Sequence, residues 1–336
     1  MYKIVDYKHL GGQTHELVVE APQLAKKAKA GQFLIVRIGE GEERIPLTIA
    51  DHDAEAGTVT IVIQAVGHST RKIVEMRPGD TFADVVGPLG QASEIENYGT
   101  VVIVGGGVGI APIYPIARDL KLAGNRVIAI IGAKTKDLLF WEDKLAAAVD
   151  EVRIATDDGS VGHKGFVTDL LAEACDSEKV DIVWAIGPMI MMYNCVKVTK
   201  ERGIRSIVSM NPVMIDGTGM CGGCRVRVGN ETKFACVDGP EFDGDLIDFD
   251  LAMKRSRFMR DKEAEATEHD HQCNLYGKGD SPQPSVAQTG NLYGKGDIPQ
   301  PSVAQTGNLY GKGDSPQPSV AQTGDSGLHH SEGGAN

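Results

Sequence analysis

"VVIVGGGVGIAP" (residues 101–112) predicts a buried strand that ends in a glycine-rich turn and leads into a helix. Glycines let the backbone of such a turn approach a pyrophosphate, and the helix N-terminus adds N–H donors and a favourable dipole. The candidate residues are Gly105, Gly106, Gly107, Val108 and Gly109. Ile110 stands where G-x-G-x-x-G has its third glycine, and no acidic residue ends the following strand. We therefore expect a dinucleotide site that is not of the standard Rossmann type, with a purely structural turn as the alternative.

The chain beyond this turn alternates strand-like and helix-like segments. The strand-like runs "NRVIAIIGAK", "DEVRIATDDGS" and "VDIVWAIGP" are separated by helix-like runs such as "VTDLLAEACD". This alternation predicts a parallel, doubly wound α/β sheet at residues 99–205, whose ligands bind at the C-terminal ends of the strands. The candidates at two such ends are Thr156, Asp157, Asp158 and Gly159, and Gly187, Pro188 and Met189. Ordinary loop, N-cap and core roles are the alternatives for these residues.

The chain before residue 99 has a different pattern. Runs such as "THELVVEA", "QFLIVRIG" and "GTVTIVIQAVG" are rich in β-branched residues and are separated by Gly, Pro and Asp. They predict an antiparallel β-barrel at residues 1–98. Within it, Arg44 suits a phosphate, and Pro46, Leu47 and Thr48 form a rigid edge for a flat ring. A pyrophosphate cradle is expected at Gly67, Ser69 and Thr70.

Residues 206–250 form a small unit rich in glycine and cysteine, with Cys221, Cys224 and Cys236 as candidate metal ligands. Residues 251–336 begin as a polar helix and continue into three repeats of 17 residues, which start at Asn274, Asn291 and Asn308. Each repeat has few large apolar residues among Gly, Pro and Gln, so we expect this tail to be disordered.

Composition narrows the classes of function. The net charge of −12 makes nucleic acid a poor partner, because phosphate binding needs a basic surface. No apolar run is long enough for a membrane span, and the N-terminus lacks the apolar region of a signal peptide. The clustered cysteines are typical of ligands in a reducing compartment. We therefore expect a cytoplasmic protein.

Taken together, these motifs resemble the ferredoxin–NADP reductase superfamily. The match rests on R-x-P-L-T and G-x-x-T in the barrel, G-G-G-x-G in the α/β domain and a C-terminal cysteine cluster, over about residues 1–250. More narrowly, the chain resembles the electron-transfer-subunit branch. That branch includes the dihydroorotate dehydrogenase electron-transfer subunit and the small subunit of NADH-dependent ferredoxin–NADP oxidoreductase, also described as sulfide dehydrogenase.

The resemblance implies an NAD(P)H-dependent flavin and iron–sulfur oxidoreductase subunit. It implies FAD on Arg44, Pro46, Leu47, Thr48, Val62, Ile63, Gln64, Gly67, Ser69 and Thr70. It implies NAD(H) on the glycine turn and on the residues that follow the third and fourth strands, and NADP(H) stays an alternative. Hydride transfer between the two cofactors needs positioning and no protein acid or base, so no catalytic residue is expected.

The resemblance also implies a [2Fe–2S] cluster at the cysteines. The related pattern has four cysteines, C-x4-C-x2-C…C, but here the first position is Asp216, which gives D-x4-C-x2-C-x11-C. A carboxylate ligates iron as a harder donor than thiolate and should alter the potential of the cluster. A structural zinc site with the same ligands and a metal-free loop are the alternatives.

The function that the resemblance implies is electron transfer between NAD(H), FAD, the cluster and a larger subunit that carries a second flavin and [4Fe–4S] clusters. The complex would couple ferredoxin and NADPH to NAD(H), by flavin-based electron bifurcation. The alternatives are dihydroorotate oxidation, a sulfide or polysulfide oxidoreductase, and a redox- or nucleotide-sensing module without turnover.

Overall fold

The computed structural model describes residues 1–257; of the polar helix and repeat tail expected at 251–336, residues 258–336 lie outside the described residues. The described chain contains four sheets, and helices cover both faces of the largest. None of its helices is long and apolar enough to span a membrane.

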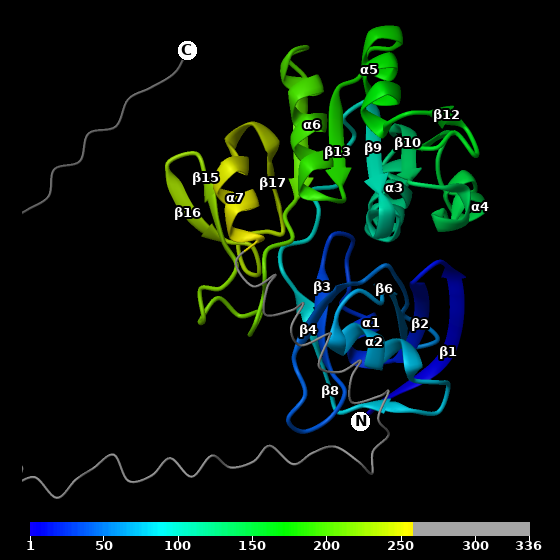
Figure 1. The fold of residues 1–336 in the computed structure, drawn as a ribbon, viewed down its shortest axis with the longest axis vertical. Helices are drawn as coiled ribbons and strands as arrows, with labels where there is room; N and C mark the ends of the chain where they lie inside the picture. Colours follow the sequence, from blue (N-terminus) through cyan, green and yellow to red (C-terminus); the bar gives the residue numbers. More distant parts are fainter. Residues whose placement is uncertain (258–336) are drawn as a thin grey trace, which may run out of the picture. The chain divides into compact units, whose positions relative to one another are not determined.

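The N-terminal segment is antiparallel and folds into two sheets around one core (Figure 1). One sheet has the strand order β5-β6-β2-β1-β7 and the other β4-β3-β8. The strands are β1 (Tyr2–Gly11), β2 (Thr14–Glu20), β3 (Phe33–Arg37), β4 (Ile45–Thr48), β5 (Asp51–Asp53), β6 (Thr58–Gln64), β7 (Thr81–Phe82) and β8 (Asp84–Leu89). Two helices accompany them, α1 (Pro22–Ala25) and α2 (His68–Glu75). Leu17 and Ile61 of the first sheet and Leu34 of the second are fully buried in the shared core.

The second part is a seven-stranded sheet of order β12-β11-β10-β9-β13-β14-β17. Its strands are β9 (Thr100–Gly106), β10 (Arg126–Ala133), β11 (Glu151–Thr156), β12 (His163–Lys164), β13 (Ile182–Ile186), β14 (Arg205–Ser209) and β17 (Glu241–Asp243). All neighbours are parallel except β17, which runs antiparallel to β14. The connecting helices are η1 (Gly107–Gly109), α3 (Ile110–Leu122), η2 (Lys136–Leu138), α4 (Glu142–Ala146), α5 (Val167–Ser177) and α6 (Met189–Lys200).

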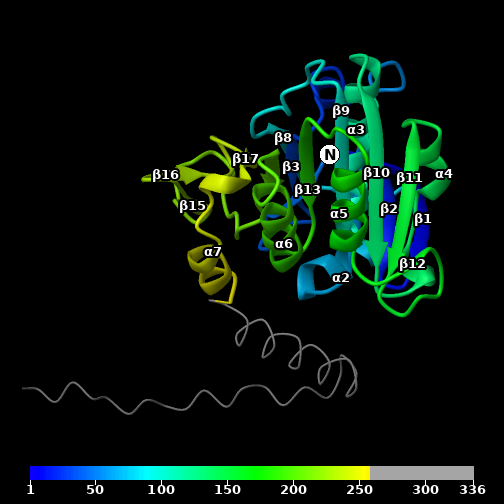
Figure 2. The same ribbon diagram turned by 90° about the horizontal axis from the view of Figure 1, so that it is seen from above.

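Alternation along β9 shows why helices cover both faces of this sheet. Val102 and Val104 join the core under α5 and α6, whereas Val101 and Ile103 join the core under α3 and α4. All four side chains are fully buried, as expected for a central parallel strand between two helical layers (Figure 2). The strand order changes direction at β9, so the glycine turn that follows it lies at a topological switch point.

The cysteine-rich segment packs onto this sheet. It contains the hairpin of β15 (Arg225–Val228) and β16 (Glu231–Phe234), the short helix η3 (Gly244–Leu246) and α7 (Phe249–Arg255). It also supplies β17 to the large sheet, while β14 crosses the boundary expected at residue 206. Glu241 at the start of β17 accepts hydrogen bonds from Trp184 Nε1 (3.1 Å) and Ser93 Oγ (2.7 Å).

Polar contacts join the antiparallel sheets to the parallel one. Trp141 Nε1 donates to Glu16 Oε2 (2.8 Å), while Asp51 pairs with Lys144 (2.7 Å) and Arg118 (2.9 Å). These contacts tie β2 and β5 of the N-terminal segment to α3 and to the start of α4.

Candidate flavin, nucleotide and cluster sites

A cavity of about 1070 Å³ lies between the N-terminal sheets and the C-terminal edge of the parallel sheet. Of the residues expected at a site, the following line it: Pro46, Leu47, Thr48, Val62, Ile63, Gln64, Thr70, Gly106, Gly107, Val108, Gly109, Asp157, Gly187 and Pro188. Segments far apart in the sequence therefore meet around one space. The remaining expected residues, Arg44, Gly67, Ser69, Gly105, Thr156, Asp158, Gly159 and Met189, are not part of its wall.

The glycine turn combines an open position with two closely packed ones. Gly107 has φ +56°, and a Cβ there would meet nothing within 4 Å, so its backbone is open to the cavity. A Cβ at Gly109 would lie 2.2 Å from the carbonyl oxygen of Ile186, and one at Gly106 would lie 2.3 Å from Met191 Sδ. Gly107 therefore leaves room for a ligand, whereas Gly106 and Gly109 allow β9 to pack against β13 and α6.

Strands β4 and β6 form the opposite wall. In β4, Pro46 to Thr48 line the cavity, and Pro46 is paired with Ile35 of β3. Near the start of α2, Thr70 Oγ1 accepts a hydrogen bond from Gly67 N (3.0 Å), while Ser69 Oγ donates to Glu43. The side chain of Ser69 is therefore engaged within the protein.

The loop after β11 presents one carboxylate to the cavity. Thr156 is fully buried, and its hydroxyl donates to Val161 O (2.7 Å), which closes the loop. Asp158 is exposed and accepts from Ser160 N (2.9 Å) and Ser160 Oγ (2.7 Å); these bonds hold its pKa below the usual value. Asp157 lines the cavity. Among the described residues that line the cavity, only Asp157 and Lys134 are charged.

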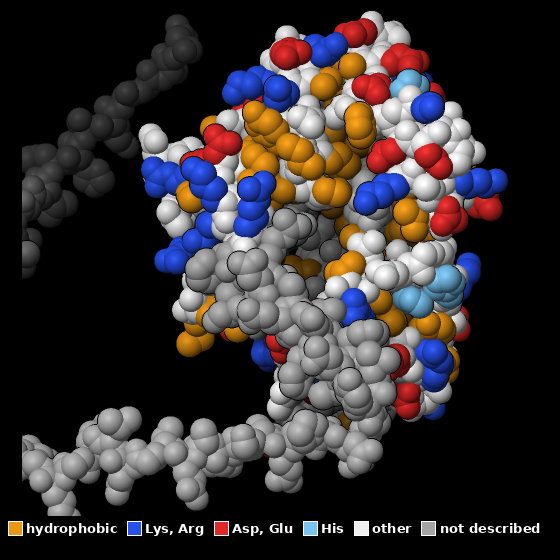
Figure 3. Space-filling model, viewed as in Figure 1, with side chains coloured by type: hydrophobic (Ala, Val, Ile, Leu, Met, Phe, Trp, Pro, Cys, Tyr) orange, Lys and Arg blue, Asp and Glu red, His pale blue; other side chains and the backbone are white. Residues whose placement is uncertain are grey.

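Several cavity residues escaped the sequence analysis. They are Thr14, Lys134, Gly165–Thr168, Ile190, Met191, Asn194, Ser209–Pro212 and Met214, among others. Lys134 directly follows β10 and Asn211 lies two residues after β14, so the rule that ligands bind beyond strand ends could have found them. Asn194 lies within α6 and carries no local signal. Figure 3 shows hydrophobic side chains gathered over the N-terminal ends of α5 and α6, where Phe166 and Ile190 are exposed.

The candidate metal ligands lie in one loop and one hairpin beside this cavity. Cys224 and Cys236 are buried with their sulfur atoms 3.2 Å apart, and Cys221 is exposed. The carboxylate of Asp216 accepts from Thr218 N (2.6 Å), Thr218 Oγ1 (2.7 Å) and Cys221 N (2.9 Å). These donors, the N–H of Thr218 foremost, hold the pKa of Asp216 well below its usual range. Burial raises the pKa of Cys236 to about 12, and the hydrogen bond with Cys224 adds to this effect.

The donor set fits an iron–sulfur cluster in kind, with three thiols and a carboxylate among glycine N–H groups. Within residues 1–257, however, no three His, Cys, Asp or Glu side chains are gathered in a geometry that holds a metal ion. Asp216 and Cys221 are joined through the backbone of the loop, whereas Cys224 and Cys236 touch through sulfur. Oδ1 of Asp216 accepts both hydrogen bonds from Thr218, whereas Oδ2 accepts only the one from Cys221 N, so Oδ2 is the oxygen with a lone pair left for a metal.

Comparison with known proteins bears on both parts of the site. Residues 211–248 match the family described as the iron–sulfur cluster binding domain of dihydroorotate dehydrogenase B. The chain is 48% identical over 261 residues to a Thermotoga maritima protein named as a homologue of the dihydroorotate dehydrogenase B (NAD(+)) electron transfer subunit, covering 78% of this chain and 92% of the relative. It is 33% identical over 252 residues to the electron transfer subunit itself from Bacillus mycoides, covering 71% and 94%.

Among solved structures, one from work on flavin-based electron bifurcation by the NADH-dependent reduced ferredoxin–NADP oxidoreductase is 45% identical, with a TM-score of 0.77. The match covers 81% of this chain and 98% of that one. These findings confirm the resemblance inferred from the motifs. The chain belongs to the family of dihydroorotate dehydrogenase B electron transfer subunits and their homologues.

Proposed function

We propose that the chain passes electrons between NAD(H), FAD and a [2Fe–2S] cluster and exchanges them with a larger subunit. The observation that carries this proposal is a cavity that β4, β6, the glycine turn, residues 209–212 and Met214 line together. Small-molecule sites span about 300–1,000 Å³, so this volume is large enough for a flavin ring and a nicotinamide. We assign FAD to residues 1–98, the nucleotide to residues 99–205 and the cluster to residues 206–250.

The cavity walls fit these groups chemically. Pro46, Leu47 and Val62 offer apolar surface to a flat ring, and Arg44 has a buried Nε without a hydrogen-bond partner among the described residues. The open backbone at Gly107 and the N-terminus of α3 suit a pyrophosphate. When bound, FAD accepts a hydride from NADH and, with the cluster, passes the electrons on singly. The chain itself orients the rings and excludes water.

We assign Asp216, Cys221, Cys224 and Cys236 as the cluster ligands. Three thiolates suit iron, and the match to an iron–sulfur binding family favours iron over zinc. The test is the content of FAD, iron, acid-labile sulfide and zinc in the anaerobically purified chain, compared with its Cys224→Ser variant. We expect FAD in both and iron with sulfide in the parent chain alone. Zinc in place of iron would contradict the assignment.

Asp216→Ala should weaken or remove the cluster while FAD stays bound. Thr218→Ala is the matched control, because it removes one donor to the carboxylate and leaves all four proposed ligands. Iron content and a cluster spectrum unchanged in Asp216→Ala would exclude Asp216 as a ligand.

We propose that the larger subunit docks at the cysteine loop. Exposed apolar side chains surround the loop, namely Val213, Ile215, Met220 and Val237. Scattered apolar residues are normal on surfaces, but four beside one redox centre suit a protein contact. Ile215→Asp with Met220→Asp should abolish co-purification with the larger subunit and leave cofactor content unchanged. If the double variant still co-purified with the larger subunit, the contact would lie elsewhere on the chain.

Two partner reactions compete for this complex. Asp216 in place of the first cysteine favours the ferredoxin–NADP oxidoreductase type, whereas the family match at residues 211–248 suits a dihydroorotate-oxidising complex equally well. The purified complex should reduce ferredoxin with NADPH only when NAD⁺ is present, and should not oxidise dihydroorotate. Oxidation of dihydroorotate by NAD⁺ would favour the second reaction. If the complex showed neither activity, sulfide or polysulfide would be the next substrate to test.

A further inference from the structure

The side chain of Arg44 joins two segments that are 172 positions apart in the sequence. Its Nη2 donates to the backbone carbonyl oxygen of Asp216 (3.2 Å). Arg44 immediately precedes β4, whose Pro46, Leu47 and Thr48 line the cavity. The same side chain therefore lies between the proposed flavin wall and the loop that carries the first proposed cluster ligand.

Arg44 also has an unused donor. Its Nε is buried and has no hydrogen-bond partner among the described residues. Buried N–H groups in proteins are nearly always paired, so this Nε calls for an acceptor outside the described residues, either water or a bound ligand. An oxygen of FAD is an acceptor of the right kind beside β4.

The loop at Asp216 packs directly on the N-terminal sheet. Gly217 has φ +77°, and a Cβ there would lie 2.5 Å from Ile35 Cδ1 and 3.0 Å from Leu89 Cδ1. Ile35 is the cross-strand partner of Pro46 in the cavity wall. The loop thus packs against β3 and β8 at Gly217 and is bound by Arg44 at Asp216.

The side chain of Asp216 links its own backbone to the rest of the cysteine loop through hydrogen bonds. Its carboxylate accepts hydrogen bonds from Thr218 N and from Cys221 N (2.9 Å). A shift of the Asp216 backbone would therefore move Cys221, the second proposed ligand. The hydrogen bond that Arg44 makes among the described residues is to the backbone of Asp216, and not to a cysteine sulfur.

We infer that Arg44 is a positioning residue that couples occupancy of the flavin site to the geometry of the cluster loop. This inference rests on the proposed function, because it needs both groups to bind. With FAD bound, the free Nε gains its acceptor and the guanidinium is fixed from both sides. Coupling is reciprocal, so the cluster should also strengthen the binding of FAD.

The test compares the cluster with and without flavin. In the full chain, removal of FAD with potassium bromide should change the g values and linewidth of the dithionite-reduced cluster. In Arg44→Gln, the signal should be altered already and should no longer respond to flavin. Loss of the cluster through Cys224→Ser should speed FAD release about fivefold or more in the parent chain, and much less when Arg44→Gln is also present.

Arg37→Gln is the matched control, because Arg37 is a half-buried arginine of β3 whose partner is Asp84 (2.6 Å). It should behave like the parent chain. If Arg44→Gln does not fold, Gly217→Ala tests the contact from the other side, since it displaces the loop and leaves β4 intact. If the cluster signal of Arg44→Gln and of Gly217→Ala responded to flavin as the parent chain does, the inference would be overturned. A chain that binds neither flavin nor iron would instead overturn the proposed function.

Discussion

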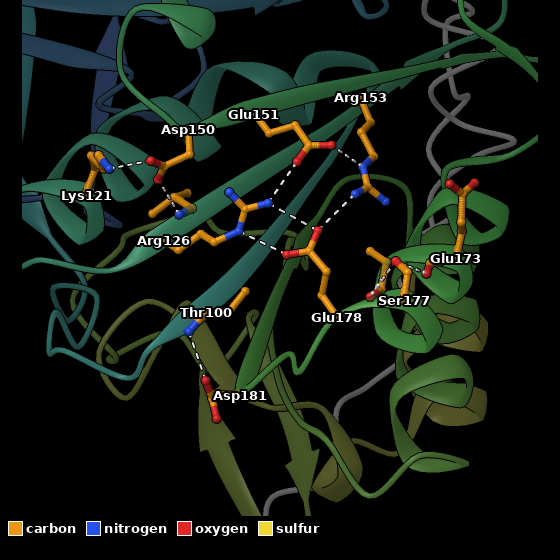
Figure 4. Close-up of polar contacts among 12 residues, drawn as sticks. Thr100, Lys121, Arg126, Asp150, Glu151, Arg153, Glu173, Ser177, Glu178 and Asp181 are labelled. Atoms are coloured by element: carbon orange, nitrogen blue, oxygen red, sulfur yellow. Dashed lines mark hydrogen bonds and ion pairs between the residues drawn. The ribbon is translucent and has the colours of Figure 1, made fainter.

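The two edges of the parallel sheet differ in how they use polar groups. At the C-terminal edge, β9 ends in a glycine turn, and the cavity there has only two charged residues in its described wall, Lys134 and Asp157. At the N-terminal edge, Figure 4 shows arginines and carboxylates paired with one another. The first edge leaves backbone N–H groups available for a ligand, whereas the second uses its charged groups within the protein.

The N-terminal network joins the starts of adjacent strands. Arg126 at the start of β10 pairs with Glu178 (2.9 Å) and with Glu151 (3.1 Å) at the start of β11. Arg153 contacts both carboxylates, at 2.7 Å and 3.2 Å (Figure 4). Asp181 accepts from the N–H of Thr100, the first residue of β9. Changes at this edge should therefore alter stability alone, and changes at the other edge should alter binding.

The largest effect is expected for Gly107→Val. The branched side chain would occupy the open space at the turn, in a conformation with φ +56° that suits glycine. Losing charge-assisted hydrogen bonds to the pyrophosphate should weaken NADH binding about 30-fold, or ~2 kcal/mol. Titration of bound NADH by fluorescence measures this.

Gly203→Val is the control for backbone strain. Gly203 follows α6 with φ +66°, and a Cβ there would meet nothing within 4 Å, but this residue does not line the cavity. The variant should lose similar stability and keep full affinity for NADH. Equal loss of affinity in both variants would mean that the turn is only structural.

Asp157→Asn should change the choice of coenzyme. A carboxylate in the cavity wall repels the 2′-phosphate of NADPH, so its neutral amide should shift the preference toward NADPH about tenfold, or ~1.4 kcal/mol. Asp158→Asn is the control, because Asp158 lies outside the wall and is held by Ser160. The ratio of kcat/KM for NADH and NADPH reports the result, and no change in Asp157→Asn would place the adenosine elsewhere.

Glu178→Gln should lower stability by about 1 kcal/mol, since it weakens two partly exposed ion pairs at the N-terminal edge. NADH affinity should not change. Unfolding in urea with parallel binding titrations measures both quantities. A loss of NADH affinity in Glu178→Gln would contradict the expectation that the N-terminal edge affects stability alone.

The smallest effect concerns acid pH. The pKa values of Glu178, Asp150 and Asp181 lie below their usual values, because Arg126, Lys121 and the N–H of Thr100, respectively, donate to them. Their stabilising contribution is therefore present above the usual values of 4.5 and 3.8, and is lost as the pH falls through the lower, folded values. Glu178→Gln should lose less stability than the parent chain between about pH 5 and pH 3. An equal loss would mean that this network is not formed in solution.

Local patterns predicted the glycine turn at the end of β9, the parallel sheet and the family. These features depend on residues that are close in sequence, such as four apolar residues before the glycines. Tertiary contacts could not be predicted in this way. β17 lies about 30 residues after β14 in the sequence, within the cysteine-rich segment, yet it pairs with β14 in the sheet. Asn194 of α6 likewise reaches the cavity without a local sequence signal.

The roles of individual residues also depended on these contacts. Gly106 and Gly109 pack against Met191 and Ile186, and nothing in the turn's own sequence distinguishes them from the open Gly107. Thr156 closes its own loop through Val161, although its place at the end of a strand indicated a ligand contact. The bond between Arg44 and Asp216 joins segments that no local pattern relates.

An anaerobic titration of the purified chain with NADH, followed by absorption and by EPR, tests the central claim most directly. We expect the flavin absorption to bleach and the signal of a reduced [2Fe–2S] cluster to appear in the same titration. A colourless chain that contains zinc and binds NADH without any spectral change would contradict the claim, and would leave a nucleotide-binding protein with a structural metal.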